Sequence, residues 1–440
     1  MKKNLWTRVV AAVGSASLLV GALAACQTDN GPVAPAGSAN DVDVALKKGG
    51  ELTWWTWSDA TQAQADAFTK DHPNVKINVV KLDNPDAAVT KLQNAVKAGS
   101  GAPDIVPVEY QTLPQLTMTG ALADLTSFGF DSYKAQFTAS TWNAVKVNDK
   151  LVGIPMDSGP MVFIYNKELY TSVGVTEAPK TWDEFVKASA AIRKKKPDTY
   201  IASGGDAGFF TSMIWAAGGH PFTVSGEKVT INLQDEGSKK FADMWGGLLQ
   251  RGELSTVSTW SDEWSKALTQ NKLATLMMGS WMISGMDDFG AGKWQVAPMP
   301  TWDGSPGSAE NGGSGLSVTE PSKNKALAAA VLRFMADGKG RDLINQGGFP
   351  STVKEFTNPT WADATFKAYG DQKANQIGAA SAKSVIAGWQ YLPYQGYANN
   401  VFGDSVGKAI GSKSDLNAAL QEWQKTLVDY GNAQGFQVNK

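Results

Sequence analysis

The sequence is poor in the residue types that build disulfides and transition-metal sites. Its 440 residues include one cysteine and two histidines. A single cysteine excludes an internal disulfide and a site with several thiolate ligands. The histidines, His72 and His220, lie far apart in the chain and form no H-E-x-x-H motif. No residue pattern predicts a metal site, although one built only from carboxylate and carbonyl oxygens stays open at this point.

The chain also lacks an excess of charge of either sign. It has 40 basic and 42 acidic residues, a formal net charge of −2, and its longest basic run is only Arg193–Lys196. Recognition of a nucleic-acid backbone requires concentrated positive charge, so nucleic acid is not an expected partner. Hydrophobic residues make up 42% of the chain. This composition is typical of a soluble globular protein of two or three domains.

Motifs for nucleophilic catalysis or phosphate binding are missing as well. The stretch Gly403–Ala409 has three residues between its glycines, and alanine stands where a phosphate loop needs Ser or Thr. Ser351–Lys354 fits S-x-x-K, but the S-D-N and K-T-G motifs that accompany it in serine enzymes do not follow. No G-x-S-x-G occurs. These absences predict a protein that is not an enzyme and needs no cofactor.

The N-terminus has the pattern of a secretory signal. Three basic residues precede an apolar run from Val9 to Ala25, which glycines and serines interrupt. The run ends Leu23-Ala24-Ala25-Cys26, which resembles the lipobox of bacterial lipoproteins. This resemblance implies a signal peptide over 1–25, a lipid on Cys26 and an extracytoplasmic protein anchored to the membrane surface. Residues 26–48 are rich in Gly, Pro, Ala and Ser and predict a flexible tether.

Strand and helix patterns alternate beyond the tether. Apolar segments at 52–57, 75–79 and 105–108 read as strands, with helical spacing between them. This alternation predicts a mainly parallel sheet with helices on both faces, and ligands bind such sheets at the carboxyl ends of the strands. Two of these ends carry Trp57, Ser58, Asp59 and Glu109, Tyr110, Gln111. Asp59 has an alternative role as a helix N-cap, and at least one of Trp54 and Trp55 is expected in the core.

Two interruptions of the pattern predict a discontinuous pair of domains. The first lies at 151–160 and the second at the glycine-rich turn 312–315. We interpret them as crossings at which the chain leaves one domain and returns to it. The expected boundaries are 49–157 plus 316–378 for the first lobe and 158–315 plus 379–440 for the second.

Eight stretches spread over the chain carry a further signal. They are Gly49–Trp55, His72–Ile77, Ala102–Ile105, Leu151–Pro155, Tyr165–Leu169, Pro179–Phe185, Met277–Trp281 and Ser322–Lys325. In this order they resemble the extracellular solute-binding proteins of bacterial ABC importers, specifically the carbohydrate-binding group that includes the maltose-binding protein. The resemblance implies a type II periplasmic-binding fold, with two α/β lobes joined by a multi-strand hinge and a ligand cleft between them. It also implies a carbohydrate ligand, an ABC permease as partner and a monomer.

The resemblance places ligand contacts at strand ends of both lobes. The candidate ligand-binding residues are Trp57, Ser58, Asp59, Glu109, Tyr110, Gln111, Asp157, Asp206, Phe209, Trp281, Gly313, Ser314, Trp389, Tyr391 and Tyr397. Trp281 follows a Gly-Ser turn that matches the position of a ligand-stacking aromatic in the family. Flat aromatic rings suit the apolar face of a sugar, and carboxylates accept strong hydrogen bonds from its hydroxyls.

Two other functions stay open beside sugar binding. The same fold could bind a non-sugar solute such as a glycerophosphodiester, a peptide or a polyamine. A lipid-anchored glycosidase would need two carboxylates about 5–5.5 Å or 6.5–9.5 Å apart. Sugar binding is favoured because the candidate positions carry no basic residue for phosphate, and nothing in the sequence singles out a catalytic carboxylate pair.

Overall fold

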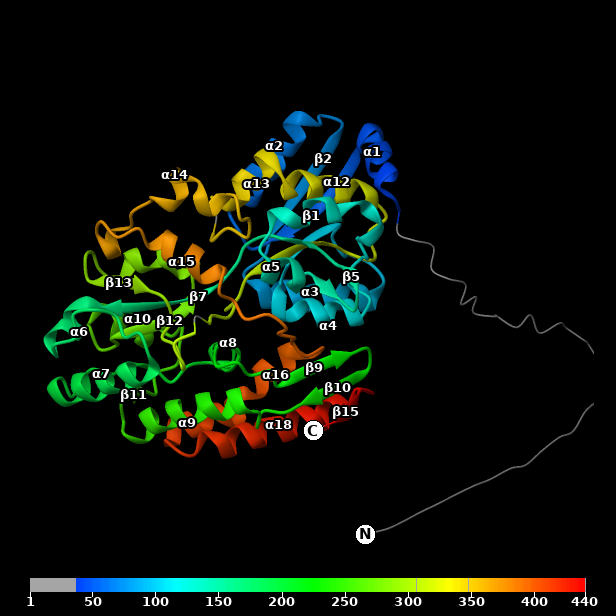
Figure 1. Cartoon of the computed structure of the whole chain (residues 1–440). Coiled ribbons are helices and arrows are strands. Elements are labelled where there is room, and N and C mark those ends of the chain that lie inside the picture. Colours follow the sequence, from blue (N-terminus) through cyan, green and yellow to red (C-terminus); the bar gives the residue numbers. More distant parts are fainter. Residues whose placement is uncertain (1–36, 306, 347, 440) are drawn as a thin grey trace, which may run out of the picture. The chain divides into compact units, whose positions relative to one another are not determined.

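The computed structural model describes residues 37–305, 307–346 and 348–439. The predicted signal peptide and Cys26 lie outside this part of the chain. The described residues form two lobes (Figure 1). Lobe 1 is built around a five-stranded sheet and lobe 2 around three small sheets, and each lobe has its own hydrophobic core. Among these residues, no helix has the length and apolar character that crossing a membrane requires.

Lobe 1 is built on a five-stranded sheet in the order β2-β1-β3-β14-β6. Its strands are β1 (Gly50–Thr56), β2 (Val75–Lys81), β3 (Ile105–Glu109), β6 (Ile154–Pro155) and β14 (Ser314–Val318). β1 runs parallel to β2 and β3, whereas β14 runs antiparallel to β3 and β6. The sheet is therefore mixed rather than mainly parallel, because β14 enters it from the other lobe. Trp54 and Trp55 are both buried, which confirms the core prediction for this strand.

Helices cover the sheet of lobe 1. They are α1 (Ala39–Lys48), α2 (Thr61–Asp71), α3 (Pro85–Ala98), α4 (Leu113–Met118), α5 (Ala139–Ala144), α12 (Lys325–Ala336) and α13 (Gly338–Asn345). Eight residues of α12 are buried in the core of lobe 1. This helix packs against α1. A short hairpin of β4 (Lys146–Val147) and β5 (Lys150–Leu151) precedes the first crossing.

α1 corrects the prediction of a flexible tether through residue 48. Ser38 and Asp41 form a capping box, in which the Ser38 side chain accepts from the Asp41 amide and the Asp41 carboxylate accepts from the Ser38 amide. Val42 is 1% exposed, and Arg333 of α12 donates to the Asp43 carboxylate at 3.2 Å. The Gly- and Pro-rich composition of residues 26–48 predicted a tether. The start of α1 was missed because a capping box depends on only two residues, which change the composition little.

Lobe 2 contains three small sheets. An antiparallel sheet has the order β12-β7-β13, with β7 (Met161–Asn166) between β12 (Thr275–Gly279) and β13 (Trp294–Ala297). β8 (Ala202–Ser203) pairs with β11 (Leu254–Ser255), and β9 (Phe222–Ser225), β10 (Lys228–Ile231) and β15 (Gln437–Asn439) form the third sheet. All six residues of β7 are buried, so this strand is the centre of the lobe.

Most of the helices in the described residues belong to lobe 2. They are α6 (Lys167–Ser172), α7 (Trp182–Lys195), α8 (Ala207–Ala216), α9 (Glu236–Gln250), α10 (Asp262–Thr269), α11 (Met282–Gly285), α14 (Pro359–Ala362), α15 (Ala374–Ala382), α16 (Gln395–Val401), α17 (Val406–Ser412) and α18 (Leu416–Ala433). α7 begins after Thr181, whose hydroxyl accepts from the Glu184 amide at 3.2 Å.

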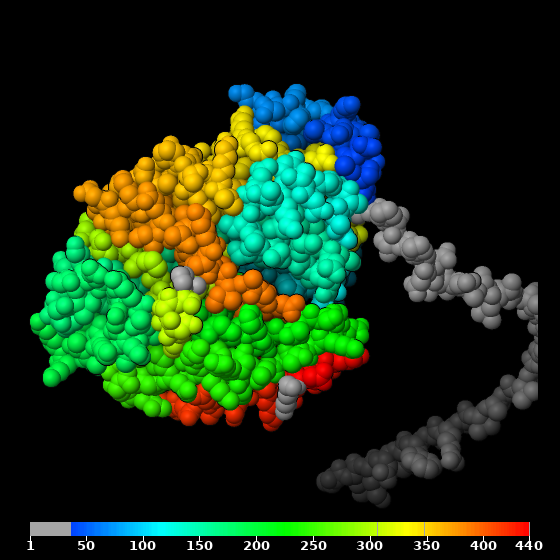
Figure 2. Space-filling model, in the orientation of Figure 1, coloured from blue at the N-terminus to red at the C-terminus, as the bar shows by residue number. Residues whose placement is uncertain are grey.

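The boundary expected at residue 378 is wrong. Ala368, Tyr369 and Ala374 belong to one core cluster with β7, β12 and β13, and α15 packs on β7. Segment 359–378 is therefore part of lobe 2, and the orange surface of this region lies against the green surface of lobe 2 in Figure 2. Composition and motifs did not indicate this, because the segment has few apolar residues and no clear motif.

Three crossings connect the lobes and form the predicted multi-strand hinge. They are 156–160 before β7, 310–313 before β14, and the segment that follows α13. A buried carboxylate holds two of them together, since Glu310 is 3% exposed and accepts from the Gly159 amide at 2.7 Å. Ser140 of lobe 1 also donates to Glu310, at 2.7 Å. Burial raises the pKa of the Glu310 carboxyl.

Candidate functional site

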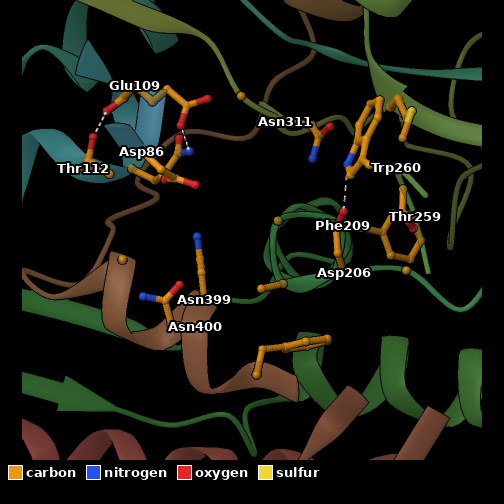
Figure 3. Close-up of a pocket in the computed structure, with 18 of the residues that line it drawn as sticks. Asp86, Glu109, Thr112, Asp206, Phe209, Thr259, Trp260, Asn311, Asn399 and Asn400 are labelled. Atoms are coloured by element: carbon orange, nitrogen blue, oxygen red, sulfur yellow. Dashed lines mark hydrogen bonds between the residues drawn. The ribbon is translucent and has the colours of Figure 1, made fainter. Parts of the chain in front are cut away.

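A cleft of about 840 Å³ lies between the lobes. Lobe 1 contributes the N-terminal part of α3 and the turn after β3, with Asp86, Glu109 and Gln111. Lobe 2 contributes the turns after β8, β11 and β12 and the helix α16. Figure 3 shows Asp86 and Glu109 on one side of this space, Asn399 and Asn400 of α16 on another, and Trp260 and Asp206 opposite them. The strand ends of both lobes thus converge on one volume.

Two tryptophans form an aromatic wall on the lobe 2 side of the cleft. The ring centroids of Trp260 and Trp281 are 5.8 Å apart, and the planes are tilted by 30°. Trp260 also contacts Trp264 at 5.1 Å, which is buried in the core of this lobe. Trp260 itself is 55% exposed. A large aromatic face left open beside a cleft is typical of a ligand-stacking site.

Glycines fix the position of the Trp281 indole. A Cβ added to Gly279 would lie 2.2 Å from Trp281 Nε1, and one added to Gly159 would lie 3.1 Å from Trp281 Cδ1. Trp281 Nε1 donates to the Asn311 carbonyl at 2.7 Å. The Trp281 indole therefore packs directly against the backbone of Gly159 and Gly279, and its hydrogen bond to Asn311 holds it in a single orientation.

Asp206 positions Trp260. Its Oδ1 accepts from the Phe209 amide at 2.8 Å as the N-cap of α8, and its Oδ2 accepts from Trp260 Nε1 at 3.2 Å, a contact drawn in Figure 3. Trp260 has a φ of 73°. A left-handed conformation costs a bulky residue about 1–3 kcal/mol and persists where surrounding contacts impose it. One carboxylate thus anchors both a helix start and an aromatic face.

Lobe 1 lines the cleft with two carboxylates, those of Asp86 and Glu109. Glu109 is the last residue of β3. Burial, and after it the negative charges of Asp86 and Asp157, raise its pKa from 4.5 to about 7. Gln111 Nε2 donates to Glu109 Oε2 at 2.8 Å, which fixes the carboxylate from one side. A carboxylate held in this way offers its remaining lone pairs to hydroxyl donors.

Amide groups line the rest of the cleft. Asn311 donates from Nδ2 to the Ser212 hydroxyl at 3.1 Å, and its Oδ1 accepts from the Gly279 amide at 3.2 Å. Gln115 Oε1 is buried and has no hydrogen-bond partner within the described part of the chain. Among those same residues, no group of three or more His, Cys, Asp and Glu side chains is arranged to hold a metal ion. The cleft therefore presents aromatic faces, the carboxylates of Asp86, Glu109 and Asp206, and amides.

The sequence model of the bacterial extracellular solute-binding proteins matches residues 54–341. The chain belongs to this family. The binding protein associated with an ABC transporter of B. animalis subsp. lactis Bl-04, solved with β-1,6-galactobiose, is 36% identical, with a TM-score of 0.78 over 89% of this chain and 99% of that one. The galacto-N-biose-/lacto-N-biose I-binding protein of Bifidobacterium longum is 26% identical, with a TM-score of 0.77 over the same shares.

A third relative comes from the curated proteins. The arabinooligosaccharide-binding protein of Halalkalibacterium halodurans is 25% identical over 328 residues, which are 71% of this chain and 72% of that protein. These relatives are binding proteins of transporters rather than enzymes. They confirm the predicted fold and family, and the word extracellular in the family description agrees with the expected extracytoplasmic location.

The structure of this solute-binding protein brings some of the candidate residues together at the cleft. They are Glu109, Gln111, Asp206, Phe209, Trp281 and Tyr397. Two of them also have packing roles: Phe209 contacts Trp245 at 5.1 Å, and Tyr397 stacks on Tyr430 at 3.5 Å.

The other candidates lie elsewhere. Trp57, Ser58 and Asp59 are not among the residues that line the cleft. The N-cap of α2 is Ala60, so Asp59 does not cap this helix. The exposed Asp59 carboxylate forms an ion pair with Lys81 instead. Tyr110, Trp389 and Tyr391 line a separate cavity of about 120 Å³ beside Glu310. Asp157, Gly313 and Ser314 belong to the hinge, where Asp157 Oδ1 accepts from the Ser314 amide at 2.6 Å and Tyr110 donates its amide to the Gly313 carbonyl at 3.0 Å.

Several cleft residues escaped the sequence analysis. Trp260 lies in the turn after β11, a strand of only two residues that the sequence analysis did not predict. Asp86 lies in the first turn of α3, where an acidic residue also suits the helix start. Asn399 and Asn400 lie on α16, two and three residues beyond the predicted Tyr397. The one available signal was the large number of tryptophans, 16 in the chain, which does not say which of them is exposed.

Proposed function

We propose that this protein binds a galactose-containing disaccharide or short oligosaccharide in the interlobe cleft and delivers it to the permease of an ABC importer. One observation carries the proposal: the open aromatic wall formed by Trp260 and Trp281 lies across the cleft from the carboxylates and amides of lobe 1. A sugar ring has an apolar C–H face and a rim of hydroxyls, so both kinds of surface are needed to hold it.

The relatives support a galactose-containing ligand. The 36% identical protein was solved with β-1,6-galactobiose, and the Bifidobacterium longum protein was solved with lacto-N-biose. A galactooligosaccharide-binding protein of Bacillus subtilis is a further relative, 24% identical over 306 residues. β-1,6-Galactobiose is therefore the first ligand to test. An arabinooligosaccharide is the second, because the relative from Halalkalibacterium halodurans is named for it.

Recognition would use the two lobes in different ways. The Trp281 indole, held by Gly159 and Gly279, gives a fixed platform for the ring face. Glu109 in its ionised form accepts hydrogen bonds from hydroxyls, and Gln111 keeps the carboxylate in place. A ligand that contacts both lobes stabilises their closed arrangement about the hinge, and that arrangement is what a permease can distinguish from the ligand-free one.

Attachment to the membrane belongs to the same proposal. Cys26 would carry the lipid and hold the protein at the extracytoplasmic surface beside its permease. The lipobox resemblance supports this anchor, and Cys26 lies outside the described residues. The monomeric state stays a prediction as well.

Thermal unfolding against a panel of ligands tests the function. The purified protein is heated alone and with β-1,6-galactobiose, lacto-N-biose, arabinooligosaccharides, maltose, spermidine, a tripeptide and glycerophosphocholine, and each sugar is recovered and analysed by chromatography. A ligand that binds only the folded state raises the midpoint by mass action. We expect a rise with galactose-containing sugars and unchanged sugar after incubation.

The panel separates the alternatives. A rise with spermidine, the tripeptide or glycerophosphocholine, and with no sugar, would keep the family but overturn the carbohydrate ligand. Disappearance of a sugar during incubation would show a glycosidase instead of a binding protein.

A further inference from the structure

A second cavity of about 540 Å³ lies beside the cleft and shares Trp281 with it. On one side it is bounded by α13 of lobe 1, and on the other by α11, α14 and the start of α15 of lobe 2. Its volume is within the range of small-molecule sites. Figure 1 shows α14 and α15 extending from α13 toward the sheet of lobe 2. The cavity is therefore another place where a ligand would touch both lobes.

The cavity has an aromatic side. Trp361 and Phe366 line it and are only half-buried. Trp361 is held edge-on by Phe349, with ring centroids 5.2 Å apart and planes at 76°, and it also contacts Phe356 at 5.8 Å. These contacts fix the indole while leaving part of its surface open. The cavity thus repeats the chemistry of the Trp260 and Trp281 wall.

The cavity also contains an unsatisfied buried amide. Asn345, the last residue of α13, is 6% exposed, and its Nδ2 lies 3.2 Å from Thr352 Oγ1 and 3.4 Å from Glu355 Oε2. Within the described residues its Oδ1 is buried and has no donor. A buried acceptor without a donor is energetically unfavourable, so a group that reaches this oxygen and donates a hydrogen bond to it would be favoured.

The charge of the lining restricts the ligand. Asp342 and Glu355 are acidic, and among the described residues no Lys or Arg lines the cavity. Anions such as phosphates and carboxylates are therefore disfavoured. Glu355 already accepts from the Asn358 side-chain amide at 2.8 Å, so its carboxylate is partly satisfied without a cationic ligand. A neutral molecule with hydroxyl donors and an apolar face fits this lining.

We propose that this cavity is a second saccharide subsite, occupied by the part of an oligosaccharide that extends past Trp281. The inference rests on the proposed function, because a sugar that stacks on Trp281 in the cleft lies at the wall common to both spaces. It implies that the protein distinguishes saccharides by length: a disaccharide fills the cleft, and longer chains gain additional contacts with Trp361 and Asn345.

Calorimetric titrations with β-1,6-linked galactose oligomers of two, three and four units test the proposal. We expect the unmodified protein to bind the trimer or tetramer at least fivefold more tightly than the dimer. Trp361→Ala should abolish that gain and leave affinity for the dimer unchanged. Trp260→Ala, a change in the cleft alone, should weaken binding of all three lengths.

A blocking variant covers the case in which Trp361→Ala fails to fold. Ser284 lines the second cavity and is exposed, so Ser284→Tyr should fill the space without disturbing the core. Ser412→Tyr places the same side chain on exposed α17, away from both cavities, and is the matched control. We expect Ser284→Tyr, and not Ser412→Tyr, to remove the preference for longer chains.

The outcomes distinguish this proposal from the proposed function. If the dimer binds and longer chains bind no better, or if their advantage survives in both Trp361→Ala and Ser284→Tyr, the second subsite is refuted and the cleft function stands. Spermidine serves as a cationic probe. If it binds the unmodified protein and Ser412→Tyr but not Ser284→Tyr, the cavity takes a cation instead of a saccharide. If no oligomer of any length binds, the proposed function itself fails.

Discussion

Replacing Glu109 by glutamine should change how the stability of the protein depends on pH. Burial and the charges of Asp86 and Asp157 raise the pKa of Glu109 from 4.5 to about 7. The folded state therefore holds this proton more tightly than the unfolded chain does. The resulting stability is fully present below pH 4.5 and is lost as the pH rises through 7.

The size of the effect follows from the two pKa values. A change from 4.5 to about 7 corresponds to about 3 kcal/mol. Glu109 keeps some contact with solvent at the cleft, so we expect about 2 kcal/mol between pH 5 and pH 8. Glutamine does not ionise, and Glu109→Gln should lose that part of the dependence. Asp157, whose pKa burial also raises to about 7, titrates in both proteins, so the comparison reports the Glu109 contribution together with the interaction between these two carboxylates.

Urea unfolding at pH 5 and pH 8, extrapolated to water, measures the difference. The control is Glu51→Gln, at an exposed position paired with Lys76 at 3.0 Å, which should follow the unmodified protein. A bound sugar should reduce the dependence in the unmodified protein, because a hydroxyl that donates to Glu109 favours the ionised carboxylate. Equal pH dependence of the unmodified protein and Glu109→Gln would refute the electrostatic account of the cleft.

Three further predictions test the aromatic platform and the anchor. Trp281→Ala should weaken sugar binding by about 1–3 kcal/mol while the protein stays folded, as calorimetry and circular dichroism would show; unchanged affinity would make Trp281 a packing residue only. Gly279→Ala places a Cβ 2.2 Å from Trp281 Nε1 and should weaken binding in the same titration, whereas Gly403→Ala, which meets nothing within 4 Å, should not. Cys26→Ser should abolish labelling by a radioactive fatty acid and release the protein from membranes, and a variant that stays membrane-bound would contradict the lipobox interpretation.

The first three strands of lobe 1 were predictable because their sequence patterns are dense. The predicted segments 75–79 and 105–108 correspond to β2 and β3 within two residues. The antiparallel direction of β14 was not predictable from its own residues. It depends on where the chain re-enters lobe 1 after the second crossing, which is a property of the whole topology.

The cleft was predictable only in part. Glu109 and Gln111 follow a strand, and Trp281 follows a recognisable turn, so position in the pattern placed them at the cleft. Trp260 owes its place to a left-handed backbone and to the carboxylate of Asp206, and these are tertiary contacts without a local signature. The turn at Trp57 had the expected residue types, yet none of its residues lines the cleft that the turn after β3 reaches.

A crystal structure of the protein with the saccharide that gives the largest thermal shift tests the central claim most directly. The account predicts a pyranose ring in the cleft with its C–H face on Trp281 or Trp260 and a hydroxyl within hydrogen-bond distance of Glu109 or Gln111. A saccharide bound outside the cleft, or inside it without contact to either tryptophan, would contradict the account.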